Sequence, residues 1–297
     1  MKKIRLGAIL VAAAMLLSQA VAPVSAAEKI HDTTPTFDIY MDGNKLKLPI
    51  QPYIQKGTTM VPFRSVFEQL GLRVSWNKKT QQIVGKNEER SIVLTVNSAT
   101  ALINGKAETM PLAPVIKNGV TYIPLRFAGT ASGGKVELYQ GGLNVVWVLS
   151  SLQNDLYEAV KAKDTDKVAQ LLSKGADPEV LIGPVGPAIF TFADESTDII
   201  GLFIKHGMGI DKRSADYAGY TLLHNAVKKG LPQVVEFLLK EGANPAIKSE
   251  SGSTPLELAE FWREQVRFGY KDILEDAKAP TVQDFDTIIS LLKDTQN

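Results

Sequence analysis

The N-terminal half of the sequence contains an internal repeat, because shifting the chain by 62 residues aligns it with itself without a gap. The aligned positions share turn dipeptides, prolines, apolar residues and an arginine. They are Asp42-Gly43 with Asn104-Gly105, Pro49 with Pro111, Gly57 with Gly119, Val61-Pro62-Phe63-Arg64 with Ile123-Pro124-Leu125-Arg126, and Gly71 with Gly133. A repeat at a fixed offset indicates two copies of one structural unit. We therefore predict two related 62-residue halves within residues 37–149.

Each copy contains the same succession of local signals. Asp42-Gly43 and Asn104-Gly105 are hairpin dipeptides, since the tightest hairpin turn requires positive φ at its centre. The β-rich runs Thr59–Val61 and Thr121–Ile123 each follow a glycine turn, which is typical of strands. A proline then ends each run, where its missing N–H is harmless in the first turn of a helix. This succession predicts a small α+β domain.

The same half of the chain carries a family resemblance. It is similar to the copper amine oxidase N-terminal-like domain, or stalk domain, of secreted bacterial proteins. The matching segments are Thr59-Met60-Val61-Pro62-Phe63-Arg64, Leu70-Gly71-Leu72-Arg73-Val74-Ser75-Trp76 and Asn118-Gly119-Val120-Thr121-Tyr122-Ile123-Pro124-Leu125-Arg126-Phe127. The resemblance implies a non-catalytic appendage. Despite the family's name, the segment has neither histidine nor cysteine, and carboxylates alone are poor copper ligands, so we expect no copper site.

Arg64 and Arg126 occupy the same position in the two halves, and two interpretations of them are open. Paired guanidinium groups suit the binding of an anionic polysaccharide or a carboxylate. Alternatively, each arginine holds its strand–helix corner together by bonding backbone carbonyls or a carboxylate. Their equivalence within a repeat favours the structural role.

From Leu152 onward the pattern changes to helical periodicity with a period near 33 residues. Gly175, Gly207 and Gly242 recur at this spacing, and each follows a pair of large apolar residues. A period near 33 made of two helices and a turn resembles the ankyrin repeat. The resemblance implies an all-α ankyrin-repeat solenoid of about four repeats over residues 152–297. The polar junction Ser150-Ser151 is the predicted boundary, and we expect the segments on its two sides to fold separately.

The copies differ in how well they match the ankyrin pattern. Residues 219–245 match along the whole length, and the next copy begins with Thr254 as a cap, Pro255 in the first turn and Glu257 completing a capping box. The copy around 185–210 departs from the pattern. The terminal copy contains an insertion near 262–280. This insertion is either a capping helix that shields the open end of the stack or a ligand-contacting excursion.

The first residues have the form of a secretory signal peptide. A basic head precedes an apolar run, Leu6–Leu17, and small residues end at Val24-Ser25-Ala26. We predict a signal peptide over 1–26, a linker over 27–36, and a secreted protein that is extracellular or associated with the cell envelope. The apolar run is too short for a stable membrane anchor, so we expect no membrane span after cleavage.

Composition narrows the chemistry further. The chain has no cysteine and only three histidines, at positions 31, 206 and 224, so we expect no metal site, no cofactor and no cysteine nucleophile. Lys plus Arg total 33 against 32 for Asp plus Glu, which argues against nucleic acid as a partner. Motifs of nucleophilic elbows, phosphate loops and zinc helices are missing from the sequence. The ankyrin resemblance implies that His224 satisfies loop backbone groups. We therefore predict that the protein is not an enzyme.

A secreted, non-catalytic binding protein is the function that these observations favour. The ankyrin part is expected to bind an unidentified protein, and the first domain to act as a scaffold or to attach to a cell-wall polymer. The resemblance places partner contacts on loop tips and first helices, with candidates Asp216, Tyr217, Tyr220, Asn225 and Lys228. Two alternatives remain: a cell-wall-associated hydrolase or an inhibitor of one, and a purely structural surface component.

Overall fold

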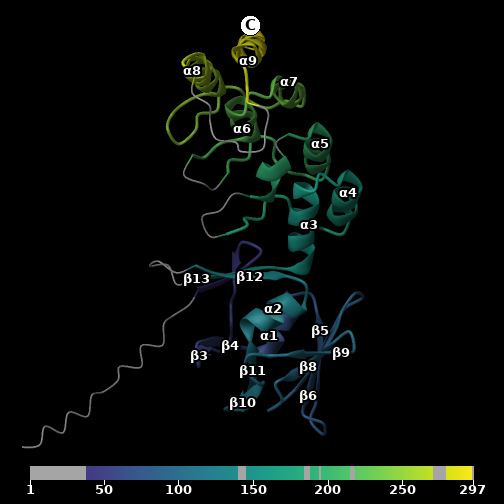
Figure 1. The fold of residues 1–297 in the computed structure, drawn as a ribbon. Coiled ribbons are helices and arrows are strands. Elements are labelled where there is room, and N and C mark those ends of the chain that lie inside the picture. The colour runs from purple at the N-terminus through teal and green to yellow at the C-terminus, as the bar shows by residue number, and fades with distance from the viewer. Residues whose placement is uncertain are drawn as a thin grey trace, which may run out of the picture. The chain divides into compact units, whose positions relative to one another are not determined.

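The computed structural model describes residues 38–139, 145–183, 188–193, 195–214, 218–269 and 279–295. The predicted signal peptide and linker lie outside these residues. Residues 34–297 form one compact unit. Its first part consists mostly of β-strands with two short helices, and its later part is helical (Figure 1).

One sheet joins the centres of the two sequence copies. Its strand order is β10-β11-β4-β3, and all of its neighbours are antiparallel. Each of its two hairpins leads directly into a short helix, with Pro62 or Pro124 as the N-cap residue. The elements are β3 (Tyr53–Gln55), β4 (Thr58–Pro62), α1 (Phe63–Gln69), β10 (Val115–Lys117), β11 (Val120–Pro124) and α2 (Leu125–Ala131).

Two further sheets complete the strand-rich part. The first is an antiparallel meander of β5 (Arg73–Asn77), β6 (Gln82–Lys86), β7 (Ser91–Thr95), β8 (Thr100–Ile103) and β9 (Lys106–Thr109). The second has the order β12-β13-β1-β2, with β1 parallel to β13. Its strands are β12 (Lys135–Tyr139), β13 (Val145–Leu149), β1 (Asp38–Met41) and β2 (Asn44–Lys45).

Most elements of the first sequence copy have a counterpart at the 62-residue offset. The bounds of β1, β3, β4, α1 and β5 shift by 62 onto those of β8, β10, β11, α2 and β12. The predicted hairpin turns also match in conformation, since Asp42 and Asn104 have φ of 47° and 50°. Each N-terminal hairpin lies in the sheet of the other copy: β1–β2 beside β13, and β8–β9 in the sheet that contains β5 and β6.

Strand β13 is buried on both faces, which explains its uninterrupted apolar sequence. Val146 and Val148 belong to the core of the strand-rich part. Val145, Trp147 and Leu149, on the opposite face, belong to the core of the helical part. The two parts therefore share a core at this strand. The polar junction Ser150-Ser151 did not predict this shared core.

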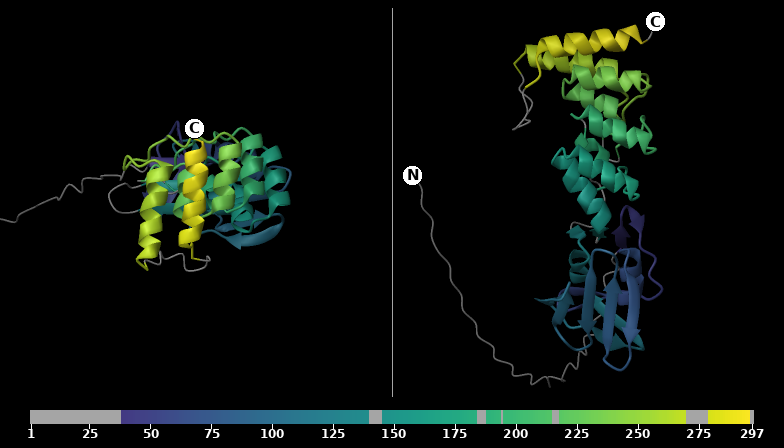
Figure 2. Two further views of the ribbon diagram at one scale, coloured as in Figure 1. Left: turned by 90° about the horizontal axis from the view of Figure 1, so that it is seen from above. Right: turned by 90° about the vertical axis from the view of Figure 1, so that its right-hand side faces the viewer.

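The helical part begins directly after β13 and continues to the end of the described chain. In chain order the helices pack as α3 with α4, the 3₁₀ helix η1 with α5, α6 with α7, and α8 with α9, and Figure 2 shows them stacked side by side. The copy that departs from the repeat pattern is the one that contains η1. The bounds are α3 (Ser151–Lys161), α4 (Thr165–Ser173), η1 (Ile189–Ala193), α5 (Thr197–Lys205), α6 (Leu222–Lys228), α7 (Pro232–Lys240), α8 (Pro255–Arg267) and α9 (Val282–Asp294).

The helix ends follow the sequence signals. Thr254 caps α8, and the Glu257 carboxylate accepts a hydrogen bond from the Thr254 N–H at 2.8 Å, so the predicted capping box is confirmed. Gly242 follows the C-cap residue of α7 with φ of 94°, a conformation that favours glycine. Of the insertion near 262–280, residues 262–267 extend α8 and residues 270–278 lie outside the described chain. Among the helices that the structure describes, none has the length and apolarity to cross a bilayer.

Candidate binding sites

Of the five candidate partner-binding residues, the structure describes Tyr220 just before α6, and Asn225 and Lys228 on that helix. Asp216 and Tyr217 fall outside the described residues. Tyr220 is half-buried, and its ring stacks on that of His224 with centroids 5.5 Å apart and planes 5° apart. Asn225 and Lys228 lie three residues apart on α6, with Lys228 exposed. Residues at this spacing share a helix face, so α6 presents an amide and an ammonium group on one face.

His224 is fully buried and joins two loops rather than facing a substrate. Its Nδ1 accepts a hydrogen bond from the Thr221 N–H at 3.4 Å and lies 2.8 Å from the Thr221 Oγ1. Its Nε2 lies 3.2 Å from the carbonyl oxygen of Ser253, to which it donates when Nδ1 accepts. Burial lowers the pKa of His224, and the nearby Arg213 charge acts in the same direction. The imidazole is thus a neutral structural link between successive loops.

The two loop tips that the ankyrin resemblance implies lie near residues 214–220 and 247–253, and their described residues contact each other. The Glu250 N–H donates to the Ala218 carbonyl at 3.0 Å, and the Glu250 carboxylate lies 3.6 Å from the Arg213 guanidinium. Within the second tip, the Ser249 and Ser251 hydroxyls are 2.9 Å apart, and the Ser253 N–H donates to Ser249. The tips therefore form one connected polar surface.

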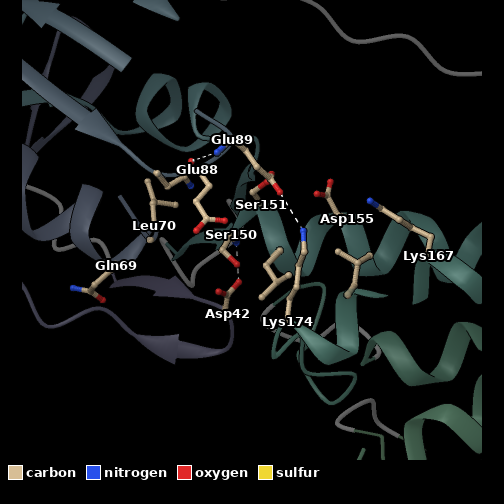
Figure 3. Close-up of a pocket in the computed structure, with 14 residues that line it drawn as sticks. Asp42, Gln69, Leu70, Glu88, Glu89, Ser150, Ser151, Asp155, Lys167 and Lys174 are labelled. Atoms are coloured by element: carbon tan, nitrogen blue, oxygen red, sulfur yellow. Dashed lines mark hydrogen bonds and ion pairs between the residues drawn. The ribbon is translucent and has the colours of Figure 1, made fainter. Parts of the chain in front are cut away.

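A cavity of about 480 Å³ lies where the β1–β2 turn, the end of α1, the β6–β7 turn and helices α3 and α4 meet (Figure 3). Its charged side chains come from all of these elements except α1. Lys174 of the α4 C-cap forms an ion pair with Glu89 at 3.3 Å. The charged lining residues are Asp42, Glu88, Glu89, Asp155, Lys167 and Lys174.

Asp42 fixes the start of α3 at one end of this cavity. Its carboxylate accepts a hydrogen bond from the Ser150 N–H at 2.8 Å, and Ser150 is the N-cap residue of that helix. Burial raises the pKa of Asp42, although the hydrogen bonds from Ser150 act against it. Burial also raises the pKa of Asp155. The local sequence around Asp42 predicts only a turn, because it does not reveal a partner 108 residues away.

A second cavity, of about 720 Å³, lies entirely in the strand-rich part and was missed by the sequence analysis. We call it the Trp76 groove. It lies between the β4–α1 corner, the β5–β6 turn and the β10–β11 turn. Ile50 and Ile116, both on it, are 40% and 46% exposed. The residues that line it are Pro49, Ile50, Pro62, Phe63, Arg64, Ser65, Trp76, Lys78, Gln81, Ile116, Gly119, Val120 and Thr121.

Arg64 and Arg126 are both exposed at the start of their helices. The Arg64 Nη1 lies 3.4 Å from the Glu68 carboxylate one turn further along α1, and its guanidinium carbon lies 5.7 Å from the Phe63 ring centre. Both members of this ion pair are more than half exposed, so the pair is worth little. This ion pair lies within α1 and does not link the helix to the preceding strand, and Arg64 also lines the Trp76 groove.

Within the described ranges, no three or more His, Cys, Asp or Glu side chains form a cluster that could hold a metal ion.

Two segments of the chain match protein-family models. Residues 40–146 match the copper amine oxidase N-terminal domain. Residues 204–259 match ankyrin repeats (many copies). The predicted domain architecture is thereby confirmed at the level of these two families.

Comparisons with individual proteins cover only part of each chain. The fowlpox virus (strain NVSL) ankyrin repeat protein FPV216 is 33% identical over 113 residues, 36% of this chain and 38% of that protein. The Mus musculus B-cell lymphoma 3 protein homolog is 30% identical over 106 residues, 35% and 23% of the respective chains. The human 2-5A-dependent ribonuclease is 33% identical over 66 residues, 22% and 9%. This chain therefore spans less than half the length of each of these relatives.

Among solved structures, the ankyrin repeat domain of Bcl-3 aligns with a TM-score of 0.35 and 24% identity, over 46% of this chain and 50% of that chain. Both family matches coincide with distinct stretches of secondary structure: residues 40–146 are mostly strands, and residues 204–259 are mostly helices and turns. The chain carries a copper amine oxidase N-terminal domain over residues 40–146 and ankyrin repeats over residues 204–259.

Proposed function

We propose that this protein is a secreted, non-catalytic binding protein. Its ankyrin repeats form a solenoid of about four repeats that takes a protein partner. Its first domain, made of two related halves, serves as a scaffold or attaches the chain to the cell envelope. The match of residues 204–259 to ankyrin repeats carries the proposal, because stacked repeats leave an extended surface whose usual role is recognition.

The partner surface comprises the two loop tips and the face of α6 that bears Asn225 and Lys228. The hydrogen bond from Glu250 to Ala218 supports this assignment, since it holds the tips together before any partner arrives. Preorganised loops lose less conformational entropy on binding. Tyr220 offers a large ring with a polar end, the combination enriched among residues that dominate binding energy. Asp216 and Tyr217 remain candidates from the sequence, just before Tyr220 in the chain.

Affinity capture from extracellular proteins with the full chain as bait tests this surface. Lys228→Ala and Asn225→Ala should weaken capture of the specific partner at least tenfold and leave the thermal unfolding curve unchanged. Lys240→Ala on α7 is the matched control, since Lys240 is also an exposed helical lysine but lies on the second helix of its pair. Equal capture by all variants would remove α6 from the binding surface.

Secretion is a separate part of the proposal. The basic head, the short apolar run and the small residues before Ala27 support export with removal of residues 1–26. Mass spectrometry of the exported protein should find Ala27 or Glu28 as the first residue. An exported chain that retains Met1 contradicts it.

A cell-wall-associated hydrolase is the second candidate, and the cavity of Figure 3 is the observation that favours it. Glycoside hydrolysis requires two carboxyl groups that flank one bond, one of them with a raised pKa. Asp42 and Asp155 both line this cavity and both have raised pKa values. If the chain hydrolyses purified cell wall and Asp155→Asn abolishes the activity, the binding proposal gives way to this one.

A further inference from the structure

The Trp76 groove differs from the corresponding surface of the other sequence copy in its chemistry. At the 62-residue offset, Phe63 corresponds to Leu125, Trp76 to Leu138 and Lys78 to Gln140. The first copy thus has two aromatic rings and an additional cation where the second has aliphatic and neutral residues. Phe63 is buried in the core of the strand-rich part, whereas Trp76 packs against that core and remains partly exposed. This difference points to a ligand that the first copy binds and the second does not.

The charge of the groove limits what that ligand is. Arg64 and Lys78 are the charged residues of its described lining, and none of the lining residues is acidic. Among the described residues, Arg64 forms an exposed ion pair with Glu68 and lies near the Phe63 ring, and no ion pair of Lys78 is found there. A guanidinium group binds a carboxylate through two parallel hydrogen bonds. The groove is therefore complementary to an anion.

The remaining lining residues combine flat apolar surface with hydroxyl and amide groups. Trp76 supplies a half-buried ring, Phe63 a ring that is only 8% exposed, and Ser65, Thr121 and Gln81 supply hydrogen-bonding groups. A pyranose ring has the matching character, because its C–H groups form an apolar face while its hydroxyls lie around the edge. An acidic sugar adds the carboxylate that Arg64 and Lys78 would bind.

We propose that the Trp76 groove binds a carboxylate-bearing glycan, with one uronic acid ring against Trp76 and its carboxylate on Arg64 and Lys78. This inference rests on the proposed envelope-attachment role of the first domain and names the polymer class for that role. The partly open cavity of about 720 Å³ accommodates a short stretch of such a chain, and the exposed Ile50 and Ile116 extend the contact beyond the first ring.

Titration of the full chain with oligogalacturonate, followed by calorimetry and by the Trp76 indole resonance, tests the proposal. The wild type should bind saturably, and a neutral maltooligosaccharide of the same length should bind at least tenfold more weakly. Trp76→Leu installs the residue of the other copy, and Arg64→Ala removes an exposed side chain. Each should raise the Kd at least tenfold without lowering the unfolding temperature by more than a few degrees.

Arg126→Ala is the matched control, because Arg126 is the exposed equivalent of Arg64 outside the groove. It should leave the Kd unchanged. An equal loss of affinity in both arginine variants would show that net charge alone causes the effect, which contradicts the proposed site. No saturable binding by the wild type, or unchanged binding by Trp76→Leu, overturns the proposal. If an acidic, leucine-containing peptide binds more tightly than oligogalacturonate, the proposal is also overturned. Capture of a protein partner through Lys228 is measured separately, so failure here leaves the binding function standing.

Discussion

Val61 and Ile123 face each other across the β4–β11 ladder, and they are also the same position of the 62-residue repeat. The neighbouring pairs follow the same symmetry. Met60 pairs with Pro124 and Pro62 with Tyr122, while the 62-residue offset relates Met60 to Tyr122 and Pro62 to Pro124. An antiparallel pair of equivalent residues places a local two-fold axis between them, as in a symmetric dimer interface. The two copies thus meet as subunits of a dimer do, but within one chain.

The pair at this axis predicts a large stability effect. Both side chains are fully buried, so Ile123→Ala should cost about 2–5 kcal/mol through the cavity it leaves. Val61→Ala should cost less, because fewer methyl groups are removed. Since the residues are in contact, the double variant should deviate from additivity by about 0.5–3 kcal/mol. Urea unfolding measures all three, and Ile54→Ala on the exposed edge strand β3 is the control that should change little. Additive losses would mean that the two residues are not energetically coupled.

The repeat in the sequence predicts the local structure of both copies but not how they join. Asp42-Gly43 and Asn104-Gly105 form turns where the dipeptides predict them, because turn preference depends on adjacent residues. The exchange that places β1 beside β13 was not predictable in this way, because an internal repeat fits equally well whether each hairpin joins its own copy or the other. The Trp76 groove was missed because it also depends on residues that are distant in the sequence. Trp76 lies in an alternating strand pattern, and nothing local shows that Ile116 lies beside it.

Leu238 tests the register of the ankyrin pattern. It is fully buried on α7, as its position in the second helix of a repeat predicts. Leu238→Ala should therefore cost about 2–5 kcal/mol. Lys240→Ala on the same helix removes only an exposed ion pair with Glu236 and should change stability by less than about 0.5 kcal/mol. Equal effects of the two variants in denaturant unfolding would contradict the assigned register.

His224 predicts a loss of stability in mild acid. Its pKa is lowered by burial, so the unfolded chain takes up a proton more readily than the folded protein. The stability that the neutral imidazole contributes is present above its ordinary pKa and is lost as the pH falls through that value. Between pH 7.5 and 5.5 the loss should reach up to about 1.4 kcal/mol.

The variant His224→Gln isolates this effect. It should be less stable than the wild type at neutral pH, since the link to Ser253 is weakened, but its stability should fall less between pH 7.5 and 5.5. If His224→Gln retains the full wild-type loss of stability between pH 7.5 and 5.5, the titrating group is not His224.

The Asp42 carboxyl group should change stability with pH in the direction opposite to that of His224. Burial raises its carboxyl pKa, so the folded protein holds the proton more tightly than the unfolded chain, and stability decreases as the pH rises above the ordinary aspartate range. Asp42→Asn keeps an oxygen for the Ser150 N–H and tolerates the φ of 47°. This variant should match or exceed the wild-type stability at pH 7, with the difference shrinking toward pH 4. Asp42→Ala loses the hydrogen bond, which costs about 1 kcal/mol, and should be less stable at both pH values.

Strand β13 predicts cooperative unfolding of the strand-rich and helical parts. Trp147 is buried on the helical side, stacks on Tyr40 at 5.4 Å, and donates from Nε1 to the Leu181 carbonyl at 3.1 Å. Separating the chain at Ser150-Ser151 would expose this face of the strand to water. Tryptophan fluorescence and far-ultraviolet circular dichroism of the full chain should therefore report coincident denaturant transitions.

The variant Trp147→Phe tests the coupling between the two parts by removing one hydrogen bond. The aromatic ring is kept and the donor to the carbonyl of the partly buried Leu181 is lost, which costs about 1 kcal/mol. Because β13 belongs to both cores, hydrogen exchange should accelerate in β1 and β12 as well as in α3. Acceleration confined to the helical part, together with two separate denaturant transitions in the wild type, would show that the two parts unfold independently despite the shared strand.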